Sequence, residues 1–216
     1  MKRAALFDMD HTVLRVDSSM SWMRYLRRRG ELSKRFVAKA LWWSVQYKLA
    51  LLDMDRVADR VVEGMRGNAE SEMIEMTARW NEEDLVHAIA SRARATIDRH
   101  RERGDVLALL TGSSTYAARH VARGLGIEHV LSTELEVRDG RFTGRLSQRC
   151  FGVHKVPVAE RWAREVGVDL DSAVFYSDSY NDLPMLSRVG APIAVNPDAR
   201  LRRHAMRERW PIERWS

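Results

Sequence analysis

The stretch AALFDMDHT, residues 4–12, decides the fold. The apolar run Ala4–Phe7 predicts a short buried strand, and two acids, Asp8 and Asp10, follow it directly. A bare Asp-x-Asp pattern is common in turns and at helix starts. At the end of a buried strand, however, the same pattern places carboxylates at the edge of a sheet, where ligands bind in parallel α/β folds.

Later apolar runs repeat this arrangement, each ending in polar residues: 105–110 before Thr111, 172–177 before Asp178, and 193–195 before Asn196. A fifth strand is expected over 128–131. Helices are expected between these strands, over 114–125, 155–166 and 181–188. Strands alternating with helices predict an α/β fold with a doubly wound parallel sheet.

Two stretches interrupt the alternation. Residues 134–146 alternate in polarity around Asp139-Gly140, which predicts a small β-hairpin. Residues 15–87 contain no convincing strand, and helices are expected over 18–29, 33–51, 53–65 and 70–80. We therefore expect a helical cap domain, 15–87, inserted after the first strand of a core made of residues 1–14 and 88–216.

The composition is that of a globular protein, with 216 residues of which 45% are hydrophobic. The single cysteine, Cys150, excludes an internal disulfide, favours a reducing, cytoplasmic location, and is expected to be a buried apolar group. The net charge of +6 suits acidic partners, although an arginine-rich solvated surface explains it as well.

Four polar blocks follow one another along the chain: Asp8-Met9-Asp10-His11-Thr12, Thr111-Gly112-Ser113, Lys155, and Asp178-Ser179-Tyr180-Asn181-Asp182. In this order they resemble the four motifs of the haloacid dehalogenase superfamily. The helical insertion resembles the cap of the subgroup that includes phosphoserine phosphatase. The resemblance spans nearly the whole chain and implies a Rossmann-like core and a phosphatase activity.

The residue types fit that chemistry. A carboxylate can attack phosphorus and form an aspartyl-phosphate, and Asp8 is the matching nucleophile. Asp10, two positions on, is expected on the other side of the extended backbone. From there it could protonate the leaving oxygen and then activate water.

The acids also predict a metal. Asp8, Asp10, Asp178 and Asp182 would share one crevice with a phosphate, and their like charges need a hard cation such as Mg²⁺. The resemblance implies that Asp8 and Asp178 bind it through side chains and Asp10 through its backbone carbonyl. Asp182 would support the metal from nearby.

Basic and polar groups are expected around the phosphate. Lys155 can pair with the nucleophile and the phosphoryl oxygens. Thr111 offers a hydroxyl, and Gly112 and Ser113 offer backbone N–H groups at an expected helix start, which together form an anion site. By analogy, Asn181 orients Lys155 or the substrate.

The substrate is open to more than one interpretation. Asp17 lies nine residues after Asp8, where phosphoserine phosphatase has an acid that binds the substrate amine. This favours a small, phosphoserine-like metabolite, although Asp17 also suits the N-cap of a helix starting near Ser18. Arg60 or Arg66 is the candidate for binding a substrate carboxylate. His11 departs from the serine usual in that subgroup.

A lipid phosphate is the alternative substrate. Residues 36–52 are apolar almost all round, which predicts either a helix buried in the cap or an interfacial helix at a membrane surface. A phosphatase of the phosphatidylglycerophosphatase type would fit the second case. The stretch is too short and too charged for a confident membrane span.

Rival functions come from other classes. The basic runs Arg27–Arg29 and Arg200–Arg203 prompt a non-enzymatic module for nucleic acid, but no nucleic-acid motif is present, so no such partner is expected. A phosphotransferase on the same fold is a second rival, because only water access separates transfer from hydrolysis. Homodimers occur in the resembled family, so a homodimer is a further possibility.

Overall fold

The computed structural model describes residues 2–31 and 54–215. It contains a seven-stranded sheet in the order β4-β3-β2-β1-β5-β6-β7. Every neighbouring pair is parallel except β3 and β4. The strands are β1 (Ala4–Phe7), β2 (Val106–Ser114), β3 (His129–Arg138), β4 (Arg141–Gln148), β5 (Val174–Ser177), β6 (Ala191–Val195) and β7 (Ile212–Glu213).

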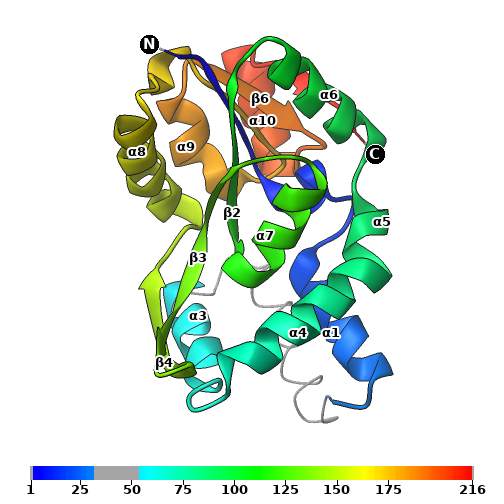
Figure 1. Cartoon of the computed structure of the whole chain (residues 1–216). Helices are drawn as coiled ribbons and strands as arrows, with labels where there is room; N and C mark the ends of the chain where they lie inside the picture. The colour runs from blue at the N-terminus through cyan, green and yellow to red at the C-terminus, as the bar shows by residue number, and fades with distance from the viewer. Residues whose placement is uncertain (1, 32–53, 216) are drawn as a thin grey trace.

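Helices cover both faces of this sheet (Figure 1). One face carries α6 (Ser91–Glu102) and α7 (Thr115–Gly124), and the other carries α8 (Lys155–Val166), α9 (Leu183–Arg188) and α10 (Ala199–Glu208). Strand β1 alternates between two apolar clusters, because successive side chains of a strand point to opposite faces. The predicted doubly wound α/β fold is confirmed.

Within the described residues, β1 is followed by the helices α1 (Ser18–Arg28), α3 (Met54–Glu63) and α4 (Glu70–Trp80). A turn over Asn81–Leu85 and the short α5 (Val86–Ala88) then lead back to the sheet. The outgoing and returning segments lie side by side, since the Arg15 N–H donates to the Ala88 carbonyl (2.8 Å). The cap boundaries at 15 and 87 stay a prediction.

The predicted helix 33–51 and the apolar stretch 36–52 lie outside the described residues. Among the helices that the structure does describe, none combines the length and apolarity needed to cross a membrane.

The predicted hairpin is present as β3 and β4. Its turn residues Asp139 and Gly140 have φ values of 50° and 71°, as a two-residue hairpin turn of type I′ requires. The expected fifth strand is not separate from it, because β3 runs continuously from the parallel sheet into the hairpin. The hairpin reaches the cap (Figure 1), where the Gly67 N–H donates to the Phe142 carbonyl at 2.8 Å.

Helix α6 was not predicted. Its buried positions, Ala93, Thr96, Ile97 and His100, follow helical spacing but include only one large apolar residue among several arginines. His100 is buried because Asp105 (2.7 Å) and the Tyr176 hydroxyl (2.8 Å) bind its two ring nitrogens. Part of α6 is therefore buried through hydrogen bonds, and the hydrophobic pattern of the sequence does not reveal such burial.

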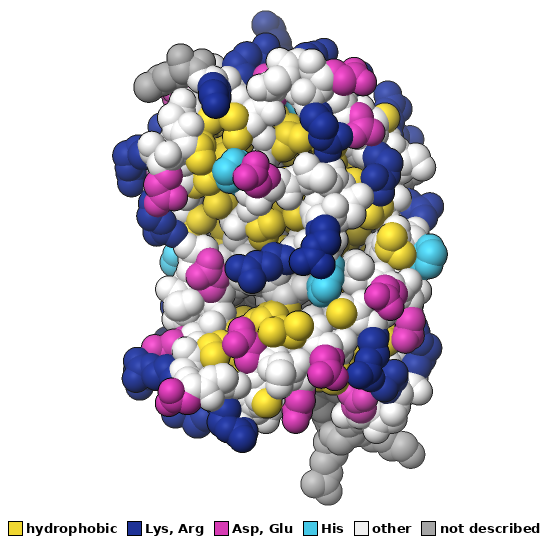
Figure 2. All heavy atoms as spheres, in the orientation of Figure 1, with side chains coloured by type: hydrophobic (Ala, Val, Ile, Leu, Met, Phe, Trp, Pro, Cys, Tyr) yellow, Lys and Arg dark blue, Asp and Glu magenta, His cyan; other side chains and the backbone are white. Residues whose placement is uncertain are grey.

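The basic runs are partly engaged within the molecule. Arg28 forms an ion pair with Asp84 at 2.8 Å, and Arg200 lies 4.2 Å from the centre of the Tyr180 ring. Figure 2 shows Lys and Arg side chains interspersed with Asp and Glu over the face in view. This distribution favours the solvated-surface interpretation of the charge.

Candidate active site

Asp8 lies at the centre of the sheet, directly after β1. The strand order reverses at β1, with β2 on one side and β5 on the other, and ligands of doubly wound sheets bind at the carboxyl end of such a strand. The Asp8 N–H donates to the Tyr176 carbonyl of β5 at 2.9 Å, which fixes the backbone of this residue. Its side chain is close to fully buried, with the residue 7% exposed.

Lys155, the first residue of α8, joins two of the acids. Its ammonium group donates to Oδ1 of Asp8 (2.7 Å) and to Oδ2 of Asp182 (2.6 Å). The hydroxyl of Ser177 donates to the same Asp182 oxygen at 2.7 Å. Burial opposes the charge of Lys155, but the neighbouring charges of Asp182 and Asp8 raise its pKa, so the group stays an ammonium ion.

The acids carry more negative charge than Lys155 balances. Burial raises the pKa of Asp8 to about 7, against the lowering effect of Lys155 and with a further rise from Asp182. Burial, followed by the charges of Asp8 and Asp182, raises the pKa of Asp178 to about 9. Ionised acids at this place therefore need an additional positive charge.

Asp10 lies in a tight turn over Met9–Val13, and its own backbone angles, φ −71° and ψ 136°, are extended as expected. The chain reverses because His11 adopts left-handed backbone angles, with φ at 53°. Oδ1 of Asp10 accepts the Ser18 N–H (2.9 Å), and Oδ2 accepts the hydroxyls of Ser18 (3.0 Å) and Ser113 (3.0 Å). Burial, and then the charge of Asp17, raises the pKa of Asp10 to about 6.

Thr111, Gly112 and Ser113 lie in the last part of β2, and the expected helix start follows directly, because Ser114 is the N-cap of α7. Pairing with β3 continues as far as Ser114, so the strand ends later than its apolar run suggests. The Ser113 N–H donates to the hydroxyl of buried Thr111 at 3.1 Å. Gly112 packs closely against Phe151, since a Cβ at position 112 would lie 3.1 Å from the Cβ of Phe151.

The fourth block follows β5. Asp178 is half-buried, whereas Asp182 is buried at the end of a 3-10 turn, Tyr180–Asp182. Asn181 is exposed, and its N–H donates to the Ser179 hydroxyl at 3.2 Å. The two acids therefore differ in surroundings: Asp182 holds Lys155, while Asp178 faces the charges of Asp8 and Asp182.

Asp17 caps α1, since its Oδ1 accepts the Met20 N–H at 2.8 Å. The same carboxylate lies close enough to Asp10 to raise the pKa of that acid. Of the candidate arginines, Arg66 packs against the hairpin, with its side chain 3.1 Å from a Cβ placed on Gly144, and Arg60 is exposed. Asp17 is therefore the N-cap of α1. Binding of a substrate by Asp17, Arg60 or Arg66 stays a prediction.

A magnesium ion fits this donor set. Within residues 2–31 and 54–215, no three His, Cys, Asp or Glu side chains are grouped to hold a metal by themselves. Mg²⁺ needs fewer, because it typically uses one or two carboxylates, waters and a substrate phosphate. Asp8 and Asp178, whose pKa values are raised by burial and by neighbouring acids, would supply the carboxylates.

Some residues of the site carry no signal in the sequence. Ser18 supplies two of the three hydrogen bonds to Asp10, and Ser177 holds Asp182. Both are serines next to an acid, a pattern too common to predict a role. Cys150, as expected, is buried, and burial raises the pKa of its thiol to about 12.

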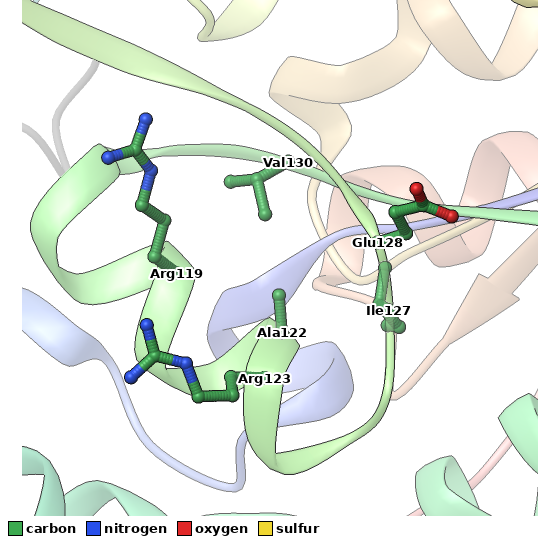
Figure 3. Close-up of a pocket in the computed structure, with 6 residues that line it drawn as sticks. All are labelled: Arg119, Ala122, Arg123, Ile127, Glu128 and Val130. Atoms are coloured by element: carbon green, nitrogen blue, oxygen red, sulfur yellow. The ribbon is translucent and has the colours of Figure 1, made fainter.

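A cavity of about 460 Å³ lies apart from these acids, between α7 and the start of β3 (Figure 3). Figure 3 shows Arg119 and Arg123 projecting from α7 on one side, with Glu128 on the other. Of the six residues lining it, none belongs to the predicted site. This cavity therefore lies outside the group of acids that follows β1.

The chain is similar to known proteins over most of its length. Residues 5–187 match the family described as haloacid dehalogenase-like hydrolase. The chain is 30% identical to a histidinol-phosphatase of Neisseria meningitidis serogroup C, over 98% of both chains. It is 34% identical to phosphoserine phosphatase SerB1 of Mycobacterium tuberculosis, over 97% of this chain and 70% of that protein.

A solved structure is similar over its whole length. The chain superposes on a protein of unknown function from Bordetella pertussis Tohama I with a TM-score of 0.89 and 30% identity. The match covers 99% of this chain and 98% of that one.

Proposed function

This chain belongs to the haloacid dehalogenase-like hydrolases and is a phosphoric monoester hydrolase, and on that premise we propose that Asp8 and Mg²⁺ hydrolyse a small amine-bearing phosphate ester. The observation that carries the proposal is the shared ammonium group of Lys155, which lies 2.7 Å from Oδ1 of Asp8. That contact holds the Asp8 carboxylate at the point where the strand order of the sheet reverses, and a phosphate can approach it there.

The first step is attack of an Asp8 carboxylate oxygen on phosphorus. A bond forms between that oxygen and phosphorus, the ester P–O bond breaks, and Asp10 gives its proton to the leaving oxygen. Lys155 stabilises the charge that moves onto the phosphoryl oxygens. When bound, Mg²⁺ would offset the combined negative charge of the carboxylates and the phosphate.

The second step returns Asp8 to its free form. Asp10, now ionised, takes a proton from water, which attacks the phosphorus of the aspartyl-phosphate and releases phosphate. The three hydrogen bonds from Ser18 and Ser113 support both roles, because they hold the Asp10 carboxyl group in one place. Thr111, Gly112 and Asn181 are proposed to contact the phosphate as well.

The substrate class is proposed from the relatives and from Asp17. Histidinol phosphate and phosphoserine, the substrates in the relatives' names, are both phosphate esters of 2-amino alcohols. They differ in the second substituent, an imidazole in one and a carboxylate in the other. The charge of Asp17 beside Asp10 would suit the amine that the two share.

A substrate panel tests this proposal. Phosphate release would be measured with Mg²⁺ for phosphoserine, histidinol phosphate, phosphoethanolamine, sugar phosphates, nucleotides, and lipid phosphates in micelles. We expect the 2-amino alcohol phosphates to be preferred, and EDTA to stop turnover. Preference for the lipid phosphates would contradict the proposal and support the alternative based on residues 36–52. Transfer of the phosphoryl group to an added alcohol, without free phosphate, would indicate a phosphotransferase.

A further inference from the structure

Asn196 joins the C-terminal end of the chain to the turn that carries Asp10. Its side-chain Nδ2 donates to the backbone carbonyl of His11 at 3.0 Å. Its Oδ1 accepts the backbone N–H of Trp215 at 2.9 Å, and its own N–H donates to the Glu213 carbonyl at 2.9 Å. One side chain therefore bridges the catalytic turn and the segment that includes β7.

The backbone at both ends of this bridge is unusual. Asn196 has φ at 44° and His11 has φ at 53°, both in the left-handed region. Asparagine tolerates that region better than most residues, because its short polar side chain can bond locally. The side-chain amide of Asn196 is thereby presented to the His11 carbonyl from a backbone that few other residues would adopt.

The bridge bears on the direction of the Asp10 carbonyl. In a trans peptide the Asp10 C=O and the His11 N–H point in opposite directions, so holding one fixes the other. The His11 N–H donates to the Val16 carbonyl at 3.3 Å, and Asn196 holds the next carbonyl along, that of His11. The two peptide groups on either side of the His11 Cα atom are therefore both restrained.

The far end of the bridge is itself firmly packed. Trp215 is 3% exposed, and its ring lies 5.0 Å from that of Tyr176 and 6.5 Å from that of Phe7. Phe7 precedes the nucleophile, and the Tyr176 carbonyl accepts the Asp8 N–H. The C-terminal segment thus contacts the same part of the sheet that carries Asp8.

We propose that Asn196 is a positioning residue for the metal site. It acts through the His11 carbonyl, and so sets the direction of the Asp10 backbone carbonyl that would bind Mg²⁺. This inference rests on the proposed function, because it takes that carbonyl as a ligand. It assigns a role to a residue beyond all four motif blocks.

Two variants of the full chain separate positioning from packing. Asn196→Gly adopts the left-handed backbone without strain but loses both side-chain hydrogen bonds. Asn196→Asp keeps an acceptor for Trp215 and removes only the donor to His11. The negative charge that Asn196→Asp adds would by itself attract a cation, so weaker metal binding in this variant cannot come from simple electrostatics. Asn68→Gly and Asn68→Asp, at an exposed position in the cap, are the matched controls.

The measurement is the affinity for Mn²⁺ without substrate, followed by electron paramagnetic resonance, alongside circular dichroism and the unfolding midpoint. We expect both Asn196 variants to bind Mn²⁺ about 10-fold more weakly or worse, as for other residues that orient metal ligands, with the Asn68 variants unchanged. In turnover, the Mg²⁺ requirement should rise while KM for the substrate stays the same.

Wild-type Mn²⁺ affinity in the folded Asn196→Asp protein would overturn the inference while leaving the proposed function intact. If Asn196→Asp does not fold, wild-type Mn²⁺ affinity in the folded Asn196→Gly protein would overturn the inference instead. A wild-type protein that bound no Mn²⁺ and released no phosphate would instead refute the proposed function, and this inference with it.

Discussion

The ammonium group of Lys155 lies 2.7 Å from Oδ1 of Asp8, although 147 positions separate the two residues in the chain. Both are buried, and the second partner of Lys155 is Asp182, at 2.6 Å. One ammonium group thus pairs with two carboxyl groups. With both carboxyl groups ionised, Lys155, Asp8 and Asp182 together carry a net negative charge before any phosphate binds.

Asp8→Asn should abolish phosphate release. An amide is a poor nucleophile, and loss of the attacking group typically costs about 10⁴-fold or more in kcat. Asp98→Asn, on the exposed surface of α6, makes the same charge change and should be as active as wild type. Phosphate release by purified proteins of equal thermal stability measures this. Turnover by Asp8→Asn that survives removal of any wild-type contaminant would contradict the nucleophile assignment.

Asp178→Asn and Asp182→Asn should fail in different ways. We expect Asp178→Asn to raise the Mg²⁺ concentration for half-maximal activity at least about 10-fold, because it removes a metal carboxylate. Asp182→Asn should lower kcat about 100-fold at saturating Mg²⁺, because it weakens the hold on Lys155. Titrating activity with Mg²⁺ for each variant checks this. The same Mg²⁺ dependence for both would show that our division of roles is mistaken.

The metal-free protein should lose stability as pH rises. Asp8 and Asp178 have pKa values raised from 3.8 to about 7 and about 9, so between pH 4 and 9 the folded state holds more protons than the unfolded state. Its stability therefore falls with rising pH in that window. Mg²⁺ should raise the unfolding midpoint more at pH 8.5 than at pH 5, and scanning fluorimetry with EDTA or Mg²⁺ measures this. Equal Mg²⁺ shifts at the two pH values would argue against a metal at these acids.

Asp17 can be tested apart from its role as a helix cap. Asp17→Ser keeps an oxygen for the Met20 N–H and removes the charge, whereas Asp17→Ala removes both and should cost about 1 kcal/mol of stability. We expect Asp17→Ser to raise KM for phosphoethanolamine about 10-fold, from loss of an ion pair with the amine, and to leave KM for ethyl phosphate unchanged. Equal changes for the two esters would mean that Asp17 does not recognise the amine.

Cys150 should be inert in the folded protein. Burial raises the pKa of its thiol to about 12, so only about one thiol in 10⁴ is ionised at pH 8. Reaction with a disulfide reagent should be at least about 100-fold slower in the native protein than in urea, since the thiolate is the reactive form. Release of the coloured thiolate from the reagent follows the rate. Fast native labelling would show that this region opens to solvent.

The sequence by itself determined the sheet and the gathering of the acids. Short apolar runs that end in polar residues place Asp8 and Asp178 at the carboxyl ends of β1 and β5, which are neighbouring parallel strands. The hairpin at Asp139-Gly140 was equally clear, because few dipeptides adopt left-handed angles at both positions. These features depend on local patterns, which a sequence displays directly.

Tertiary structure decided what local patterns cannot show. Strand β2 extends to Ser114 because β3 lies beside it, and the chain reverses after Asp10 because His11 is left-handed. The bridge from Asn196 to His11 spans 185 positions, so no motif spacing could reveal it. Hydrogen bonds between distant polar groups depend on directions and distances of a few ångströms, and those exist only after the chain has packed.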